Sequence, residues 1–306
     1  MTDHYIQLGA TRVRYRVTSP QAKAKPRGRI LVLPGFTEFV EKHQDQADGF
    51  AQMGLEALTI DWPGQGLSSR MTAHPTAIHI DDYDEMLAAA EAAADDAGFL
   101  DERLPLMIFG HSMGGHLGLR LGRWLKDRRN ITVNGVMLSS PMIMPPVMPP
   151  KLVHRVLDLV CALGVSRLRV PFQQGFSRSR DFSPNNNLTR DPKGYSLQFD
   201  LFDQNPALRT RGPTFGWVRA AYRSCLATTG DDVWMSDYDL PVQAHLAGDE
   251  TVVGAAYSAP CLGKIKGAEI HHYDEAKHEL MLELPEVLEA VWTRMAAFVD
   301  RQLKAG

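Results

Sequence analysis

The chain has 306 residues, of which 44% are hydrophobic and 23% charged, and its formal net charge is −3 at pH 7. These values are ordinary for a globular protein and give no reason to expect a nucleic-acid partner. The chain starts without a leader of basic and then apolar residues, and no apolar run comes near the roughly 18 residues that span a bilayer. Its three cysteines are too far apart for a disulfide framework or a zinc site, so we expect a cytoplasmic protein without a transmembrane segment.

Short apolar runs alternate with helical patterns along the first 140 residues. Residues 4–17 predict a hairpin, and four apolar runs follow it, at 29–33, 55–60, 104–109 and 131–138. The helical patterns between them lie at 41–53, 80–96 and 113–126. Continuous apolar strands alternating with helices indicate a mostly parallel sheet that is buried on both faces.

Five prolines interrupt this alternation within residues 141–150, and such a segment cannot continue a helix or a central strand. The alternation resumes near Pro241 with the buried strand "LPVQAHLAG", the edge strand "AEIHHYD" and the closing helix "LPEVLEAVWTRMAAFV". We therefore expect a core domain made of residues 1–140 and 236–306. A largely helical cap, residues 141–235, would be inserted after the sixth strand.

The expected cap is basic. Residues 151–223 hold twelve Lys and Arg against five Asp, an excess of seven positive charges, which favours an anionic substrate or interface such as a phospholipid headgroup. Its first helix has one apolar face, and methionines precede it among the prolines; these residues are Leu152, Val153, Val156, Leu157, Val160 and Leu163, with Met142, Met144 and Met148. Such a face would suit an acyl pocket or a lipid surface, or it would pack the cap on the core.

The stretch "GHSMG", residues 110–114, matches G-x-S-x-G between a predicted strand and a predicted helix. Glycines beside Ser112 permit a strained turn, because they remove the Cβ atoms that would clash with the neighbouring strand and helix. Ser112 would then project its hydroxyl at the carboxyl edge of the sheet, where the N–H groups of Met113 and Phe36 would face a developing oxyanion. The alternative is that Ser112 is an ordinary helix N-cap.

A serine nucleophile needs an acid and a base, which follow it in that order in sheets of this kind. His278 lies between the last predicted strand and the closing helix. His271 and His272 lie within that strand and face opposite ways; they also lack the H-E-x-x-H spacing of a metal site, so we expect no metal there. Asp249 and Glu250 stand side by side after the preceding strand, and either can orient an imidazole.

Together these motifs resemble the α/β-hydrolase superfamily, in particular bacterial lysophospholipases and monoacylglycerol lipases. "LPGFTEFVEKH" resembles the family's H-G-x-x-E-x-x-x-K/R-Y oxyanion loop, "DWPGQGLSSR" its D-x-x-G-x-G-x-S turn, "KHELMLELPE" its histidine loop and "NPALRTRGPTFGWVRAAYRSC" a cap segment. Pro34 replaces the usual histidine, so we expect a hydrogen bond that braces the oxyanion loop to be absent. Aligning "AGDETVV" with A-G-x-D-x-V-V puts Glu250 at the acid position, with Asp249 as the alternative.

The resemblance implies hydrolysis of a lipid-type carboxylic ester, a lysophospholipid or a monoacylglycerol, through an acyl-enzyme and without a metal or organic cofactor. His278 would take the Ser112 proton, Glu250 would stabilise the imidazolium, and the N–H groups of Phe36 and Met113 would hold the oxyanion. The basic cap would permit peripheral contact with a membrane surface. Two alternatives stay open, a non-catalytic binding module of this fold and an acyltransferase or lactone hydrolase that uses the same residues.

Overall fold

A central sheet of eight strands organises the protein, whose computed structural model describes residues 2–20, 25–147, 149–171 and 180–305. The strand order is β1-β2-β4-β3-β5-β6-β7-β8. The strands are β1 (Asp3–Leu8), β2 (Thr11–Thr18), β3 (Gly28–Leu33), β4 (Leu55–Ile60), β5 (Leu106–His111), β6 (Val133–Ser139), β7 (Val242–Ala247) and β8 (Glu269–Tyr273). The β1–β2 hairpin is antiparallel, β2 pairs antiparallel with β4, and every other pairing is parallel. The predicted mostly parallel sheet is confirmed.

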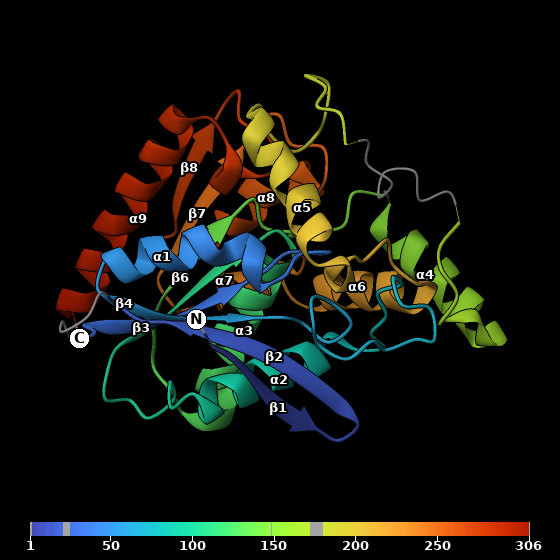
Figure 1. Ribbon diagram of the computed structural model, residues 1–306, viewed down its shortest axis with the longest axis horizontal. Helices are drawn as coiled ribbons and strands as arrows, with labels where there is room; N and C mark the ends of the chain where they lie inside the picture. Colours follow the sequence, from blue (N-terminus) through green and yellow to red (C-terminus); the bar gives the residue numbers. More distant parts are fainter. Residues whose placement is uncertain (1, 21–24, 148, 172–179, 306) are drawn as a thin grey trace.

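Helices cover both faces of this sheet (Figure 1). They are α1 (Gln44–Gln52) and α9 (Pro285–Ala305) on one face, and α2 (Tyr83–Asp96) and α3 (Met113–Arg129) on the other. Ile30 and Val32 of β3 lie in the core with α1 and α9, whereas Leu31 and Leu33 lie in the core with α2 and α3. Because successive side chains of a strand point to opposite faces, a sheet covered on both sides needs strands that are apolar throughout.

Several element boundaries differ from their predicted positions for local reasons. β5 begins at Leu106, two residues later than predicted, because Pro105 has no N–H to give to the sheet. α2 begins at Tyr83, later than the predicted start at 80, because the Asp82 side chain accepts the Asp84 N–H and caps the helix there. The predicted helix at 41–53 is a 3-10 turn, η1 (Val40–His43), followed by α1.

Between β6 and β7 the chain leaves the sheet for residues 140–241, the region where the cap is expected (Figure 1). Its elements are α4 (Pro150–Val160), η2 (Cys161–Val165), α5 (Pro192–Gln204), η4 (Pro206–Leu208), α6 (Phe215–Ala227) and α7 (Asp232–Ser236); α8 (Ala255–Leu262) and η5 (Leu280–Leu282) come later. Met142 and Met144 are buried in the core cluster, and Met148 lies outside the described residues. Among the described residues, no helix combines the length and the hydropathy that a bilayer-spanning segment requires.

The α4 helix, at the right of Figure 1, extends away from the sheet and is only partly packed. Leu157 is buried in the core cluster, together with residues of α6. The other side of the helix is open, with exposed fractions of 57% for Leu152, 52% for Val156, 68% for Leu159 and 75% for Leu163, which lies in η2. Half of the predicted apolar face, Leu152, Val156 and Leu163, is therefore exposed, whereas Leu157 and Val153 pack against the core.

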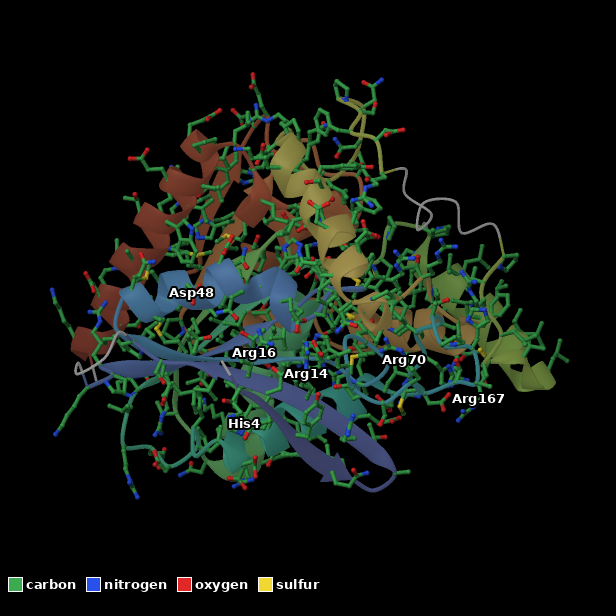
Figure 2. All side chains as sticks on the ribbon, viewed as in Figure 1. His4, Arg14, Arg16, Asp48, Arg70 and Arg167 are labelled. Carbon is green, nitrogen blue, oxygen red and sulfur yellow. The ribbon has the colours of Figure 1, made fainter. Side chains whose placement is uncertain are left out.

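Arg14 on β2 ties three segments together next to the sheet, and Arg16 lies near it (Figure 2). The Arg14 guanidinium is fully buried, with Nε 2.7 Å from Asp61 and one terminal nitrogen 2.7 Å from Glu41. Asp61 follows β4 and accepts the backbone N–H of Val40 at 2.8 Å. This cluster therefore joins the hairpin, η1 and the turn after β4 through one buried cation.

The turn from β5 into α3 needs glycine at two positions. A Cβ on Gly114 would lie 1.9 Å from the carbonyl oxygen of Leu33, and one on Gly110 would lie 2.2 Å from the carbonyl oxygen of Gly114. Both obstacles are backbone atoms, which cannot turn aside as the end of a side chain can. The expectation that these glycines remove Cβ clashes with the neighbouring strand and helix is confirmed.

We predict that Gly114→Ala lowers the free energy of unfolding by about 3 kcal/mol, because α3 must move off β3. The matched control is Gly118→Ala, one turn further along α3, where a Cβ would meet the Ile108 methyl at 3.2 Å. There the strain is offset by a helix propensity gain of about 1 kcal/mol, so the net change should be small. Urea unfolding followed by circular dichroism gives both values, and equal losses would contradict the backbone contact as the cause.

Candidate active site

Ser112 occupies the strained residue of the turn between β5 and α3. Its backbone has φ 53° and ψ −119°, a conformation that non-glycine residues rarely adopt. The turn is held by the Ser112 N–H, which donates to the carbonyl oxygen of Ser139 at 2.9 Å. Ser112 stands at the N-cap position of α3 but makes no capping hydrogen bond with its side chain. The hydroxyl is directed elsewhere, which argues against the simple N-cap interpretation.

The Ser112 hydroxyl lies in a chain of hydrogen bonds with His278 and Glu250. His278 Nε2 is 2.9 Å from Ser112 Oγ, and His278 Nδ1 is 2.7 Å from Glu250 Oε2. The other Glu250 oxygen accepts the N–H groups of Val252 at 2.7 Å and Val253 at 3.2 Å. Burial alone would raise the pKa of Glu250, but His278 and these two N–H donors outweigh it, and the pKa is lowered. Glu250 is therefore a carboxylate that faces one imidazole nitrogen.

The structure brings Glu250 to His278 and leaves Asp249 apart. Asp249 is exposed, and its backbone N–H donates to Ala276 at 3.0 Å. Histidines other than His278 have different partners. His116 contacts Ser224 and Thr229, and His271 lies beside His245 within the sheet.

The loop after β3, where Phe36 is expected to supply an oxyanion donor, is held by several hydrogen bonds. Trp62 Nε1 donates to the Pro34 carbonyl at 2.8 Å, and Gln65 Nε2 donates to the Gly35 carbonyl at 3.1 Å. The Gly35 N–H donates to Glu38 at 2.5 Å. The absence of a histidine at position 34 therefore does not leave this loop without hydrogen bonds, because the turn after β4 and Glu38 supply others.

Both expected oxyanion donors lie close to Ser112. A Cβ on Gly35 would lie 3.1 Å from the Ser112 Cβ, so the Phe36 loop passes directly beside the serine. The Phe36 ring packs on Trp217 of α6 with ring centroids 4.2 Å apart. Met113 is the first residue of α3, and the first N–H groups of a helix find no acceptor within it. The donor roles of the Phe36 and Met113 N–H groups stay predictions.

A buried cluster of ionisable groups adjoins this site and was missed by sequence reasoning. It consists of Glu38, Lys42, His43, His111 and Glu279, all buried. Ligand atoms of Glu38, His111 and Glu279 lie within 4.8 Å of one another, a spacing that would hold a metal ion and that no other set of the described residues shows. Lys42 Nζ already donates to both carboxylates. Glu38 and Lys42 stand at the E and K/R positions of the pattern H-G-x-x-E-x-x-x-K/R-Y, but that pattern does not show that they are buried or that His111 and Glu279 join them.

The loop that carries His278 is fastened to the segment between β6 and β7. Lys277 Nζ donates to the Pro184 carbonyl at 2.6 Å, and the Glu279 N–H donates to the Leu188 carbonyl at 2.7 Å. The Arg190 N–H donates to Glu283 at 3.0 Å. The position of His278 therefore depends on contacts outside the sheet as well as on β8.

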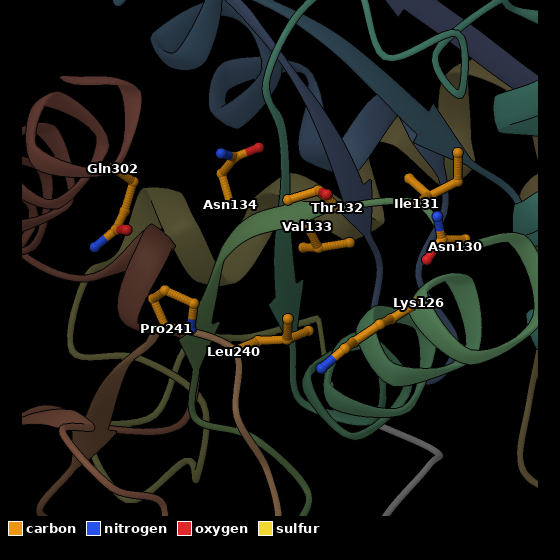
Figure 3. A pocket seen from close by; sticks show the side chains of 9 residues that line it. All are labelled: Lys126, Asn130, Ile131, Thr132, Val133, Asn134, Leu240, Pro241 and Gln302. Atoms are coloured by element: carbon orange, nitrogen blue, oxygen red, sulfur yellow. The ribbon is translucent and has the colours of Figure 1, made fainter. Parts of the chain in front are cut away.

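A separate pocket lies at the opposite end of the sheet (Figure 3). Its lining comes from the end of α3, the start of β6, the segment before β7 and α9, namely Lys126, Asn130, Ile131, Thr132, Val133, Asn134, Leu240, Pro241 and Gln302. None of the residues of the Ser112 site lines it. Since ligands of open parallel sheets bind at the carboxyl ends of the strands, this pocket is not part of the site.

Two curated relatives of this chain are named as phospholipases. The chain is 29% identical over 218 residues to lysophospholipase L2 of Escherichia coli (strain K12), a match that covers 69% of this chain and 62% of the relative. It is 26% identical over 231 residues to phospholipase YtpA of Bacillus subtilis, covering 75% and 78%. This chain therefore spans less than two thirds of the length of the first relative.

Solved structures show the fold. A soluble variant of monoglyceride lipase from Saccharomyces cerevisiae superposes with a TM-score of 0.77 at 19% identity, covering 98% of this chain and 94% of that one. A carboxyl esterase from Bacillus coagulans gives 0.78 at 15% identity, covering 99% and 98%. The fold is that of the α/β-hydrolases, as expected from the sequence.

The sequence pattern of the family described as "Serine aminopeptidase, S33" matches residues 24–285. That range contains the Phe36 loop, Ser112, Glu250 and His278. The chain belongs to this family of hydrolases.

Proposed function

We propose that the protein hydrolyses lipid-type carboxylic esters, lysophospholipids or monoacylglycerols, through an acyl-enzyme on Ser112. The observation that carries the proposal is the chain of hydrogen bonds from Ser112 through His278 to Glu250, with distances of 2.9 and 2.7 Å. A hydroxyl becomes a strong nucleophile when an oriented imidazole can accept its proton. The names of the curated relatives support a lipid ester as substrate.

In the first half of the reaction, Ser112 Oγ attacks the ester carbonyl while its proton passes to His278 Nε2. Glu250 accepts the His278 Nδ1–H and stabilises the imidazolium that forms. The N–H groups of Phe36 and Met113 donate to the oxyanion of the tetrahedral intermediate. The C–O bond of the ester then breaks, and His278 gives the proton to the leaving alcohol.

In the second half, His278 takes a proton from water as the water oxygen attacks the acyl-enzyme. The Ser112–acyl bond breaks, Ser112 recovers the proton from His278, and the fatty acid leaves. Every proton is returned, so this chain's own residues complete the cycle. Glu250 is the proposed acid because its carboxylate, and not that of Asp249, meets the imidazole.

We further propose that residues 141–235 form a cap over a core made of residues 1–140 and 236–306, and that α4 of this cap contacts a membrane surface. Leucines and a valine line the open side of α4, and basic residues are in excess along the same segment. Apolar side chains on a cationic segment suit the interface of an anionic lipid bilayer. The substrate would then enter from the surface where it resides.

We predict that Ser112→Ala abolishes hydrolysis of p-nitrophenyl esters of graded chain length, and that a fluorophosphonate probe adds once to the wild-type protein, at Ser112, and not to the variant. Single-turnover kinetics and intact mass measure the two effects. Gas chromatography of the products separates free acid from transferred acyl groups. A folded wild-type protein that neither labels nor turns over would show a non-catalytic binding module.

We predict that Glu250→Gln lowers kcat by about 10² to 10⁴-fold, because a neutral side chain no longer stabilises the imidazolium or selects its tautomer. The matched control is Asp249→Asn, an equally conservative change at the neighbouring exposed carboxylate, which should leave kcat within about twofold. Steady-state kinetics on a soluble short-chain ester checks both. The reverse ranking would make Asp249 the acid.

We predict that Leu159→Asp combined with Leu163→Asp weakens binding to phosphatidylglycerol vesicles by about tenfold or more, since each buried leucine contributes roughly 1.5 to 3 kcal/mol. Hydrolysis of a soluble short-chain ester should not change. Val233→Asp on α7 is the control, because Val233 is 67% exposed but lies outside α4. Co-sedimentation measures binding, and an unchanged affinity of the α4 variant would contradict the proposed contact.

A further inference from the structure

The buried cluster beside the active site is centred on the ammonium group of Lys42. Lys42 Nζ donates to Glu38 Oε1 and, at 2.7 Å, to Glu279 Oε1. Its side chain is 4% exposed, and those of Glu38 and Glu279 are 3% and 8% exposed. Two carboxylates and one ammonium group thus share a site with almost no access to water.

Each acidic partner of Lys42 adjoins a different part of the active site. Glu38 accepts the Gly35 N–H at 2.5 Å, and Gly35 precedes Phe36. Glu279 directly follows His278 in the chain. The Pro34–Gly35 peptide, which directly precedes the peptide that carries the Phe36 N–H, is therefore connected to the histidine loop through one cation, although residues 38 and 279 are far apart in the sequence.

The third side of the cluster is the residue before the serine. His111 Nε2 is 3.3 Å from Glu279 and 3.8 Å from Glu38, and its ring centroid is 4.9 Å from that of His278. Burial lowers the pKa of His111 to about 4, even though both carboxylates act in the opposite direction. At neutral pH His111 therefore adds no positive charge. The ammonium group of Lys42 is then the charge that lies between the two carboxylates and reduces their mutual repulsion.

Charge balance makes Lys42 necessary to this arrangement. Burial alone would raise the pKa of both Glu38 and Glu279, yet Lys42, the largest opposing cause, and neighbouring histidines hold both pKa values below their ordinary range. Without the ammonium group, two ionised carboxylates would face each other in a buried space, where like charges repel strongly. They would separate or take up protons, and the loops that carry them would move.

We propose that Lys42 is a positioning residue for the reaction. Through Glu38 and Glu279, Lys42 holds the Phe36 N–H and His278 at the positions relative to Ser112 that the reaction requires. Lys42 touches none of the reacting atoms in this role. The proposal rests on the function proposed above, because it concerns the geometry of that reaction. Misplacement of a reacting group by about 1 Å costs about 10²-fold in rate, so a small movement of either loop is enough.

The test replaces Lys42 by methionine, which keeps the length of the side chain and removes its charge. We expect Lys42→Met to lower kcat for a soluble p-nitrophenyl ester by about 10 to 10²-fold while KM changes less than about threefold. The rate constant of fluorophosphonate labelling should fall by the same factor. Each rate constant is divided by the concentration of folded protein. Circular dichroism, recorded below the unfolding transition, gives the folded fraction.

A double-mutant cycle tests the connection to the histidine loop. Glu279→Gln keeps the shape of the side chain and removes one of the two carboxylates that Lys42 balances. If the two residues act through one ion pair, the fall in kcat of Lys42→Met with Glu279→Gln is smaller than the product of the two single falls. Glu279→Gln also serves alone if Lys42→Met does not fold, and it should then lower kcat and labelling together.

Arg29→Met is the matched control, since Arg29 is a largely buried cation at the start of β3, and its carboxylate partners Glu56 and Asp101 lie at the end of the sheet opposite the site. It should lower the free energy of unfolding and leave kcat per folded molecule within about twofold. An unchanged kcat in Lys42→Met, multiplicative effects in the cycle, or an equal fall in Arg29→Met would each overturn the positioning role. An inert wild-type protein would instead overturn the proposed function itself.

Discussion

The close contact between α3 and β3 at Gly114 determines where the candidate site lies. Because no Cβ intervenes, the first turn of α3 reaches the backbone of Leu33, and the loop that follows β3 passes beside Ser112. The strained conformation of Ser112 follows from the same geometry, since β5 must turn into α3 within one residue. The serine and the loop that carries Phe36 are therefore positioned by the central strands β3 and β5. The histidine and its acid come from the loops after β8 and β7, at the side of the sheet where the strand order ends.

Parallel pairing explains how residues from distant parts of the chain meet. The carboxyl ends of β5, β7 and β8 lie at one edge of the sheet, so the loops that carry Ser112, Glu250 and His278 are neighbours there. Such convergence brings side chains to within several ångströms but does not set hydrogen-bond distances. Those depend on contacts between the loops, such as the bonds of Lys277 and Glu279 to the segment that precedes α5.

Patterns with a fixed local geometry could be predicted from the sequence, and patterns that depend on burial could not. Ser112 and His278 could be proposed as site residues because a strand-to-helix turn and a loop after the last strand have recognisable flanks. Glu250 could be separated from Asp249 only by alignment to a family pattern, since both carboxylates share one loop. The bonds that hold the Pro34 loop in place of a histidine could not be predicted, because their donors Trp62 and Gln65 lie about thirty residues further along the chain. The Lys42 cluster could not be assembled from the sequence, because the oxyanion-loop pattern includes Glu38 and Lys42 but charged residues in a short helical turn ordinarily face solvent, and Glu279 joins them from far along the chain.

A buried ion cluster beside a reaction centre is weak evidence for stability, because apolar residues of similar volume would often stabilise the fold as well or better. Charged groups add hydrogen bonds and ion pairs that fix distances and orientations. Glu38 fixes the orientation of the Gly35 N–H, and Lys42 fixes the distance between Glu38 and Glu279, whereas an apolar cluster would tolerate sliding of the loops. A reaction whose donors must meet an oxyanion within a few tenths of an ångström gains from that restriction. Under the proposed function, the free-energy cost of burying these charges therefore serves the geometry of the candidate site rather than the stability of the core.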